Sequence, residues 1–181
     1  HDEHSRVQPS ANMPYEIPCV KAVSEKPMSK IRIGVTGSGF MGRTHVDATA
    51  KLESTIPVAV TGGSRAEQLA SDYGIDCEPD VASLVARDDI DAVIISTPHW
   101  VHCEEALAAA DAGKHALVEK PMATSVEDCD RMLVAFRERG LTLSLGYHQR
   151  FREANFRTKE LIQSGAIGPV RCIQTAALFD I

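Results

Sequence analysis

The chain has 181 residues, of which 44% are hydrophobic and 24% are charged, and its formal net charge is -6. This composition is typical of a soluble globular protein with one domain of ordinary size and part of another. The acidic balance argues against a nucleic-acid partner, and the chain has no apolar stretch long enough to cross a bilayer. Without a recognisable signal sequence, we expect a cytoplasmic protein.

The first 28 residues differ in character from the rest of the chain. They are polar, contain four prolines and show neither helical nor strand periodicity. We therefore predict a disordered extension over residues 1–28. The five cysteines are an odd number without C-x-x-C spacing, which favours reduced thiols and assigns no metal ligands.

A glycine-rich motif follows the first apolar run. Residues 31–42 read IRIGVTGSGFMG, in which Gly37, Gly39 and Gly42 form a G-x-G-x-x-G between an expected strand and an expected helix. In this arrangement the first glycine permits a tight turn, the second lets the backbone approach a pyrophosphate and the third lets the helix pack on the strand. Free N–H groups at the helix end then hold the anion. The motif therefore predicts a dinucleotide site.

Strand and helix signals alternate over residues 29–150, which we expect to form one domain. We predict strands at 31–36, 57–61, 75–77, 91–96, 115–118 and 141–145, separated by helices at 41–52, 65–73, 81–86, 101–112 and a helix from the cap Ser125 through Arg139. The continuous apolar run at 91–96 is typical of a parallel strand covered on both faces. This pattern predicts an α/β Rossmann fold, a doubly wound parallel sheet with strand order 3-2-1-4-5-6.

The pattern continues beyond residue 150. We expect a helix over 155–164, ended by Gly165, and a strand over 170–177. Residues 151–181 are therefore predicted to be the truncated start of a second α/β domain.

The residues after the second expected strand bear on the choice of cofactor. That position reads Thr61-Gly62-Gly63-Ser64-Arg65 and has no acidic residue to bind a ribose 2′-hydroxyl. Ser64 and Arg65 suit a 2′-phosphate, which favours NADP over NAD. Alternatively, Arg65 is a surface residue that starts the next helix.

Two later segments place polar groups at the same sheet edge. Thr97 and Pro98 follow the fourth expected strand. On residue type alone, His102 is more often a solvated or capping residue than a catalytic base. Glu119-Lys120-Pro121 follows the fifth expected strand, so Lys120 lies near the nicotinamide end of a cofactor. Its ammonium group could stabilise an alkoxide as hydride leaves. The alternative for Glu119 is a surface salt bridge of little consequence.

These motifs together resemble the Gfo/Idh/MocA family of oxidoreductases. The resemblance spans residues 31–170 and rests on Gly37-x-Gly39-x-x-Gly42-x-x-His45, Thr97-Pro98 with His102, Ala112-Gly113-Lys114-His115, Glu119-Lys120-Pro121, Gly146-Tyr147-His148-Gln149-Arg150-Phe151 and Ile162-Gln163-Ser164-Gly165-Ala166-Ile167-Gly168.

The resemblance implies an NAD(P)-dependent oxidoreductase of sugars, polyols or related hydroxy compounds, with Lys120 as its catalytic lysine. It implies that His102, Glu119 and Arg150 lie around the nicotinamide and the substrate, and that the full-length protein is a homo-oligomer. It also implies a second domain that supplies a catalytic histidine, which this chain lacks. The predicted cofactor-binding residues are Gly37, Gly39, Phe40, Met41, Gly42, Ser64, Arg65, Thr97, Pro98, His102, Glu119, Lys120 and Arg150.

Two alternatives remain at this point. The chain could be a non-catalytic NAD(P)-binding sensor, or a module that docks on a partner through an unfinished apolar layer. A methyltransferase-like fold also starts with a glycine-rich turn after its first strand, but gives the Glu119-Lys120-Pro121 segment no role.

Overall fold

The computed structural model describes residues 29–175, so the disorder expected for residues 1–28 lies outside the described residues. It contains a six-stranded parallel sheet with the order β3-β2-β1-β4-β5-β6. The strands are β1 (Ile31–Thr36), β2 (Thr55–Thr61), β3 (Asp76–Glu78), β4 (Ala92–Ile95), β5 (His115–Val118) and β6 (Leu143–Leu145). The predicted Rossmann topology is confirmed.

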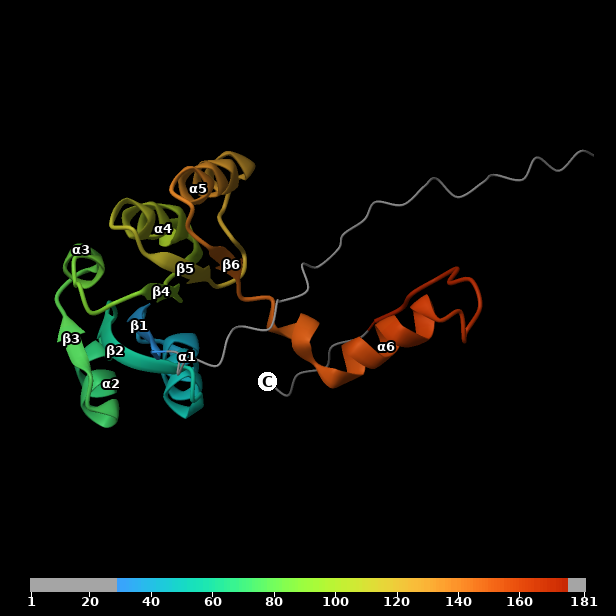
Figure 1. Ribbon diagram of the computed structural model, residues 1–181, viewed down its shortest axis with the longest axis horizontal. Coiled ribbons are helices and arrows are strands. Elements are labelled where there is room, and N and C mark those ends of the chain that lie inside the picture. Colours follow the sequence, from blue (N-terminus) through green and yellow to red (C-terminus); the bar gives the residue numbers. More distant parts are fainter. Residues whose placement is uncertain (1–28, 176–181) are drawn as a thin grey trace, which may run out of the picture.

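Helices cover both faces of this sheet (Figure 1). On one face lie α1 (Phe40–Lys51) and α2 (Ala66–Tyr73), and on the other lie α3 (Val81–Val85), α4 (His102–Asp111) and α5 (Val126–Glu138). Each face has its own apolar core, one built around Val35 and Val46 and the other around Ile95 and Phe136. Burial on both faces explains why the central strands are continuously apolar. Among residues 29–175, every helix is too short or too polar to span a membrane.

The strand order reverses between β1 and β4, and this reversal positions the site. The chain leaves β1 towards α1 on one face and leaves β4 towards α4 on the other (Figure 1). Connections that diverge in this way open a crevice at the carboxyl ends of the two strands, where ligands bind in open α/β sheets. The glycine-rich turn and the Thr97-Pro98 segment therefore meet at this edge.

Most predicted boundaries agree with the structure to within two residues. The helix expected over 101–112 begins instead with a 3-10 turn, η1 (His99–Val101), before α4. The predicted cap of α5 is confirmed, because the Ser125 Oγ accepts a hydrogen bond from the Asp128 N–H at 3.1 Å.

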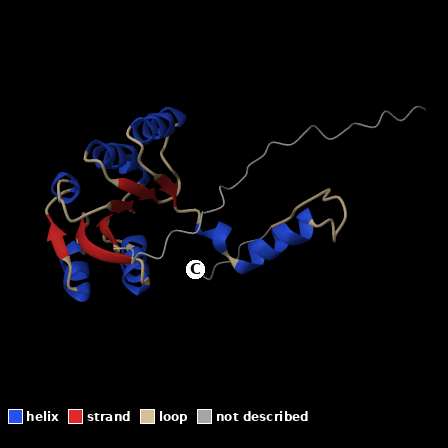
Figure 2. Ribbon diagram, in the orientation of Figure 1, coloured by secondary structure: helices blue, strands red, loops and turns tan. Residues whose placement is uncertain are grey.

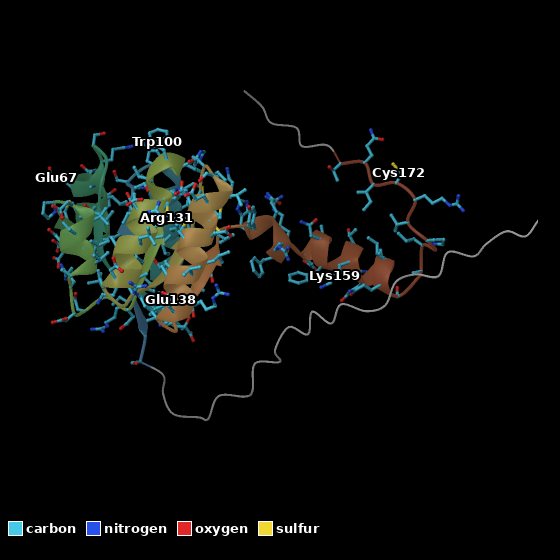
Figure 3. All side chains as sticks on the ribbon, turned by 90° about the horizontal axis from the view of Figure 1, so that it is seen from above. Glu67, Trp100, Arg131, Glu138, Lys159 and Cys172 are labelled. Atoms are coloured by element: carbon cyan, nitrogen blue, oxygen red, sulfur yellow. The ribbon has the colours of Figure 1, made fainter. Side chains whose placement is uncertain are left out.

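The segment after β6 lies apart from the sheet. It comprises a 3-10 turn, η2 (His148–Phe151), and α6 (Glu153–Gln163), which Figure 2 shows separated from the strands of the sheet. No residue of α6 is buried. Figure 3 places Lys159 of α6, and Cys172 beyond it, away from the domain that carries Trp100 and Arg131. The strand expected from Val170 is absent over residues 170–175, so that prediction is wrong there. A strand needs a neighbour to bond its N–H and C=O groups, and no other described strand pairs with this segment.

The start of β1 is joined to the start of β4 by an ion pair. The Arg32 guanidinium donates to Asp91 Oδ1 at 2.7 Å and Oδ2 at 3.0 Å, and the Arg32 N–H donates to Oδ2 at 2.8 Å. The Arg32 side-chain hydrogen bond is the main reason that the pKa of Asp91 falls to about 2.

This ion pair predicts a pH dependence of stability. Because the pKa of Asp91 is lower in the folded state, the stabilisation is complete above its ordinary value of 3.8 and is lost as the pH falls towards 2. We expect the urea midpoint of Asp91→Asn to lie below that of the wild type at pH 7 and to converge with it near pH 2. The exposed Asp88→Asn is the control, and a gap that persists unchanged at low pH would contradict this assignment.

Candidate functional site

The glycine-rich turn has a backbone geometry that fits the predicted roles. Gly37 has a φ of +91°, in the region that favours glycine, and its N–H donates to the Thr61 carbonyl at 2.8 Å. A Cβ at Gly42 would lie 1.8 Å from the Gly37 carbonyl oxygen, so only glycine lets α1 approach the turn this closely. A Cβ at Gly39 would meet no atom within 4 Å. The backbone at Gly39 therefore faces open space, as a pyrophosphate cradle requires.

A cleft of about 350 Å³ lies at this edge of the sheet. It brings together three segments that follow β1, β2 and β4, and is lined by Gly37, Ser38, Gly39, Gly63, Ser64, Arg65, Ser96, Thr97 and Pro98. Six of these nine residues are among the predicted cofactor-binding residues. The cleft has the position and the open glycine backbone that a dinucleotide needs.

Ser38 connects two walls of the cleft, a role that the sequence did not reveal. Its Oγ accepts a hydrogen bond from the Arg65 N–H at 3.2 Å, and its side chain is buried. A Cβ at Gly63 would lie 2.6 Å from this oxygen, so the loop after β2 packs directly on the serine. Ser38 occupies a variable position of the glycine motif, and only the fold shows that it meets a loop 27 residues later.

Two arginines stand beside the cleft. A smaller hollow of about 170 Å³ continues from it past Ser38 and Gly39, and its lining includes Arg43 and Arg65. Arg43 is paired with Asp72 at 2.6 Å, whereas Arg65 is exposed and has no ion-pair partner among residues 29–175. Arg65 thus retains its hydrogen-bonding capacity for an anionic ligand.

A half-buried carboxyl group supports the opposite wall. Glu105 Oε2 accepts hydrogen bonds from Thr36 Oγ1 at 2.6 Å and from Thr97 Oγ1 at 2.9 Å. Burial raises the pKa of Glu105, and the two hydroxyl donors oppose this shift. The hydrogen bonds fix the ends of β1 and β4 to α4. Glu105 was absent from the sequence predictions because its helical spacing gave no sign of what it contacts.

His102 lies behind the cleft and not inside it. Its ring has no exposed surface, and its Nδ1 and Nε2 lie 2.9 Å from the carbonyl oxygens of Pro121 and Thr97, respectively. His102 does not line the cleft, and its implied location around the nicotinamide stays a prediction. The ring joins the two segments that flank the cleft, so any effect of His102 on a ligand passes through Thr97 and Pro121.

Glu119 and Lys120 differ sharply in their surroundings. Glu119 is 6% exposed, and its Oε1 lies 2.9 Å from His45 Nε2 while its Oε2 accepts from the Lys120 N–H at 3.1 Å. The surface salt bridge considered for Glu119 is therefore not what the structure shows. Lys120 is exposed, its peptide bond to Pro121 is cis, and its ammonium group has no ion-pair partner within residues 29–175. His45 belongs to the quoted family motif, but no role for it was predicted.

A second cavity, of about 510 Å³, lies beside α1 and contains both His45 and Glu119. Its other lining residues are mainly apolar: Phe40, Met41, Thr44, Ala48, Leu117, Leu145, Gly146, His148 and Phe151. Phe40 and Met41, predicted to bind the cofactor, therefore line this cavity. Arg150 lies on η2, is exposed and lines neither cavity, so the structure does not bring it to the cleft.

Comparison with known proteins identifies the same part of the chain. The model of the Gfo/Idh/MocA oxidoreductase family, described by its NAD-binding Rossmann fold, matches residues 31–147. Inositol 2-dehydrogenase 3 of Saccharopolyspora erythraea is 36% identical over 142 residues, which are 76% of this chain and 42% of that protein. The 2,7-anhydro-N-acetylneuraminate hydratase of Mediterraneibacter gnavus is 32% identical over 143 residues, 79% of this chain and 38% of that protein.

A solved structure agrees in fold as well as in sequence. The crystal structure of scyllo-inositol dehydrogenase from Lactobacillus casei with bound cofactor NAD(H) and scyllo-inositol superposes with a TM-score of 0.73 at 28% identity, covering 77% of this chain and 43% of that one. The chain spans about two fifths of the length of these relatives. Its sequence motifs, strand order and matched region agree, and the chain belongs to the Gfo/Idh/MocA oxidoreductase family with an NAD-binding Rossmann fold.

Proposed function

We propose that this chain is the cofactor-binding part of an NAD(P)-dependent oxidoreductase that acts on a hydroxyl group of a sugar, a polyol or a related compound. The observation that carries the proposal is the cleft at the β1/β4 edge, where an unobstructed glycine backbone faces three converging loops. The inositol dehydrogenase relatives support the substrate class. The redox assignment follows them and not the relative named as a hydratase.

The residues of the cleft have distinct roles in this proposal. The turn at Gly37–Gly42 holds the pyrophosphate, and Thr97 and Pro98 flank the cofactor beyond it. A bound nicotinamide supplies the site that gives or takes the hydride. Lys120 Nζ donates a hydrogen bond to the substrate oxygen and stabilises the negative charge that develops there. Residues 151–181 begin the unit that, in the full-length protein, completes the substrate site.

The proposal includes NADP as the favoured cofactor. Arg65 lines the cleft without an ion-pair partner among the described residues, Ser64 lies next to it, and no acidic side chain lines that end of the cleft. A guanidinium group and a hydroxyl suit a 2′-phosphate better than a 2′-hydroxyl. A cytoplasmic location and a homo-oligomeric full-length protein are further parts of the proposal. Nothing in the comparisons supports a non-catalytic module, and family membership replaces the methyltransferase-like alternative.

Titration of the 181-residue chain with NADPH and NADH, followed by nicotinamide fluorescence, tests this proposal. We expect saturable binding of both and tighter binding of NADPH. Arg65→Ser should weaken NADPH binding by roughly tenfold to a hundredfold, the effect of one hydrogen bond to a charged group, and leave NADH binding nearly unchanged. Arg137→Ser, an exposed arginine on α5, is the matched control.

Two outcomes would count against different parts of the proposal. If neither dinucleotide binds, the cofactor site itself is wrong. If both bind and Arg65→Ser affects them equally, the preference for NADP is wrong and the dinucleotide site stands.

A further inference from the structure

We propose that His45 and Glu119 are a positioning pair that holds Lys120 at the nicotinamide end of the cofactor and couples it to the glycine-rich helix. The inference rests on the proposed function, in which Lys120 donates to the substrate oxygen, and on the expectation that Lys120 lies near the nicotinamide end of the cofactor. It assigns a role to His45, which has none in the sequence predictions. It also changes the role of Glu119 from a ligand contact to a support for its neighbour.

The pair joins the two elements that carry the proposed chemistry. His45 lies on α1, three residues after Gly42, and Glu119 directly precedes Lys120. Nε2 of His45 lies 2.9 Å from Glu119 Oε1, within hydrogen-bond distance, and the other carboxyl oxygen accepts from the Lys120 N–H at 3.1 Å. One carboxyl group therefore bridges the pyrophosphate helix and the backbone of the lysine.

The carboxyl group has little freedom to move. Its side chain is 7% exposed and that of His45 is 17% exposed, so few water molecules compete for the contact. Gly146, directly after β6, packs closely against the carboxyl group. A Cβ at this position would lie 2.9 Å from Oε1 and 3.3 Å from the Glu119 Cα. The Glu119 N–H also donates to the Ile95 carbonyl at 2.9 Å, which fixes the backbone to β4.

Lys120 itself is held through its backbone and not through its side chain. Its side chain is exposed and, in the described part of the chain, its ammonium group forms no ion pair. Its direction is therefore set by the backbone at Glu119–Pro121, which the carboxyl group of Glu119 and the ring of His102 fix from two sides. Removal of the His45 contact frees one of these supports and leaves the cleft at Gly39 intact.

Two ligands separate a positioning role from a purely structural one. NADPH reaches both the glycine turn and Lys120, whereas 2′-phospho-ADP-ribose lacks the nicotinamide and reports only on the cleft and its folding. In calorimetric titrations of the 181-residue chain, we expect His45→Leu to weaken NADPH binding by about 3- to 10-fold, the effect of one hydrogen bond, and to leave binding of the fragment unchanged. His45→Gln keeps an N–H donor and should restore NADPH binding.

A double-mutant cycle shows whether the pair acts through the lysine. In a Lys120→Met background, the effect of His45→Leu on NADPH binding should disappear, because the group being positioned is gone. Lys51→Gln, at the exposed end of the same helix, should change neither affinity.

Each contrary result has its own meaning. A wild-type chain that binds neither ligand overturns the proposed function and this inference with it. If the wild type binds both ligands, three results overturn the inference alone: His45→Leu has no effect on NADPH, it weakens both ligands equally, or its effect persists in Lys120→Met.

Discussion

Gly42→Ala should unfold at a much lower urea concentration than the wild type. The added Cβ would lie 1.8 Å from the Gly37 carbonyl oxygen and 2.8 Å from the carbonyl carbon, and both are backbone atoms that cannot rotate away. The start of α1 must then move off the turn that precedes it. We expect the free energy of unfolding to fall by about 1–3 kcal/mol, the usual cost of overpacking. Urea denaturation followed by circular dichroism measures this loss.

The same variant should also lose dinucleotide binding, because the turn proposed to hold the pyrophosphate is displaced with the helix. A Gly42→Ala protein with the wild-type urea midpoint would show that α1 does not pack on the turn as closely as the structure has it.

Gly39→Ala should have the opposite profile, with normal stability and weak binding. No atom lies within 4 Å of the Cβ position, and the residue has a φ of -72°, which alanine adopts readily. The methyl group would occupy the space through which a pyrophosphate reaches the N–H groups at the start of α1. We expect NADPH affinity to fall by about tenfold to a hundredfold, the loss of a hydrogen bond to a charged group, in the fluorescence titration.

The comparison of the two alanine variants separates the fold from the site. Each adds one methyl group to the same turn, three residues apart, so each serves as the control for the other. If Gly39→Ala binds NADPH as tightly as the wild type, the pyrophosphate does not lie on this turn.

The sequence predicted the architecture well because the relevant signals are local. Buried parallel strands are continuously apolar, and glycines such as Gly74 and Gly113 follow the helices that they end, so the alternation of elements and the strand order could be inferred. Where local signals are weak, elements were missed, such as the 3-10 turn over His99–Val101 that precedes α4. The prediction of a strand from Val170 is wrong over residues 170–175, because a strand needs a neighbouring strand and no local sequence pattern reveals whether one is present.

The candidate site was predicted less completely than the fold. The glycines and Thr97-Pro98 have recognisable spacing, and the structure brings them to one cleft. The contacts of Ser38 with Arg65, Glu105 with Thr36 and His45 with Glu119 join residues 27 to 74 positions apart. Such pairs have no local sequence signature. His102 is the opposite case. The family motif implied that it lies around the nicotinamide, whereas only the packing of the fold shows that its ring is buried.

The hydrogen bond between Ser38 and the Arg65 backbone has a consequence for the thermodynamics of association. It sets the spacing between the glycine-rich turn and the loop at residues 62–65 in the free protein, so, if the proposed dinucleotide binds there, less conformational entropy is lost when the complex forms. Ser38→Ala should therefore make complex formation entropically less favourable, and the apo loop at residues 62–65 should exchange its amide hydrogens faster.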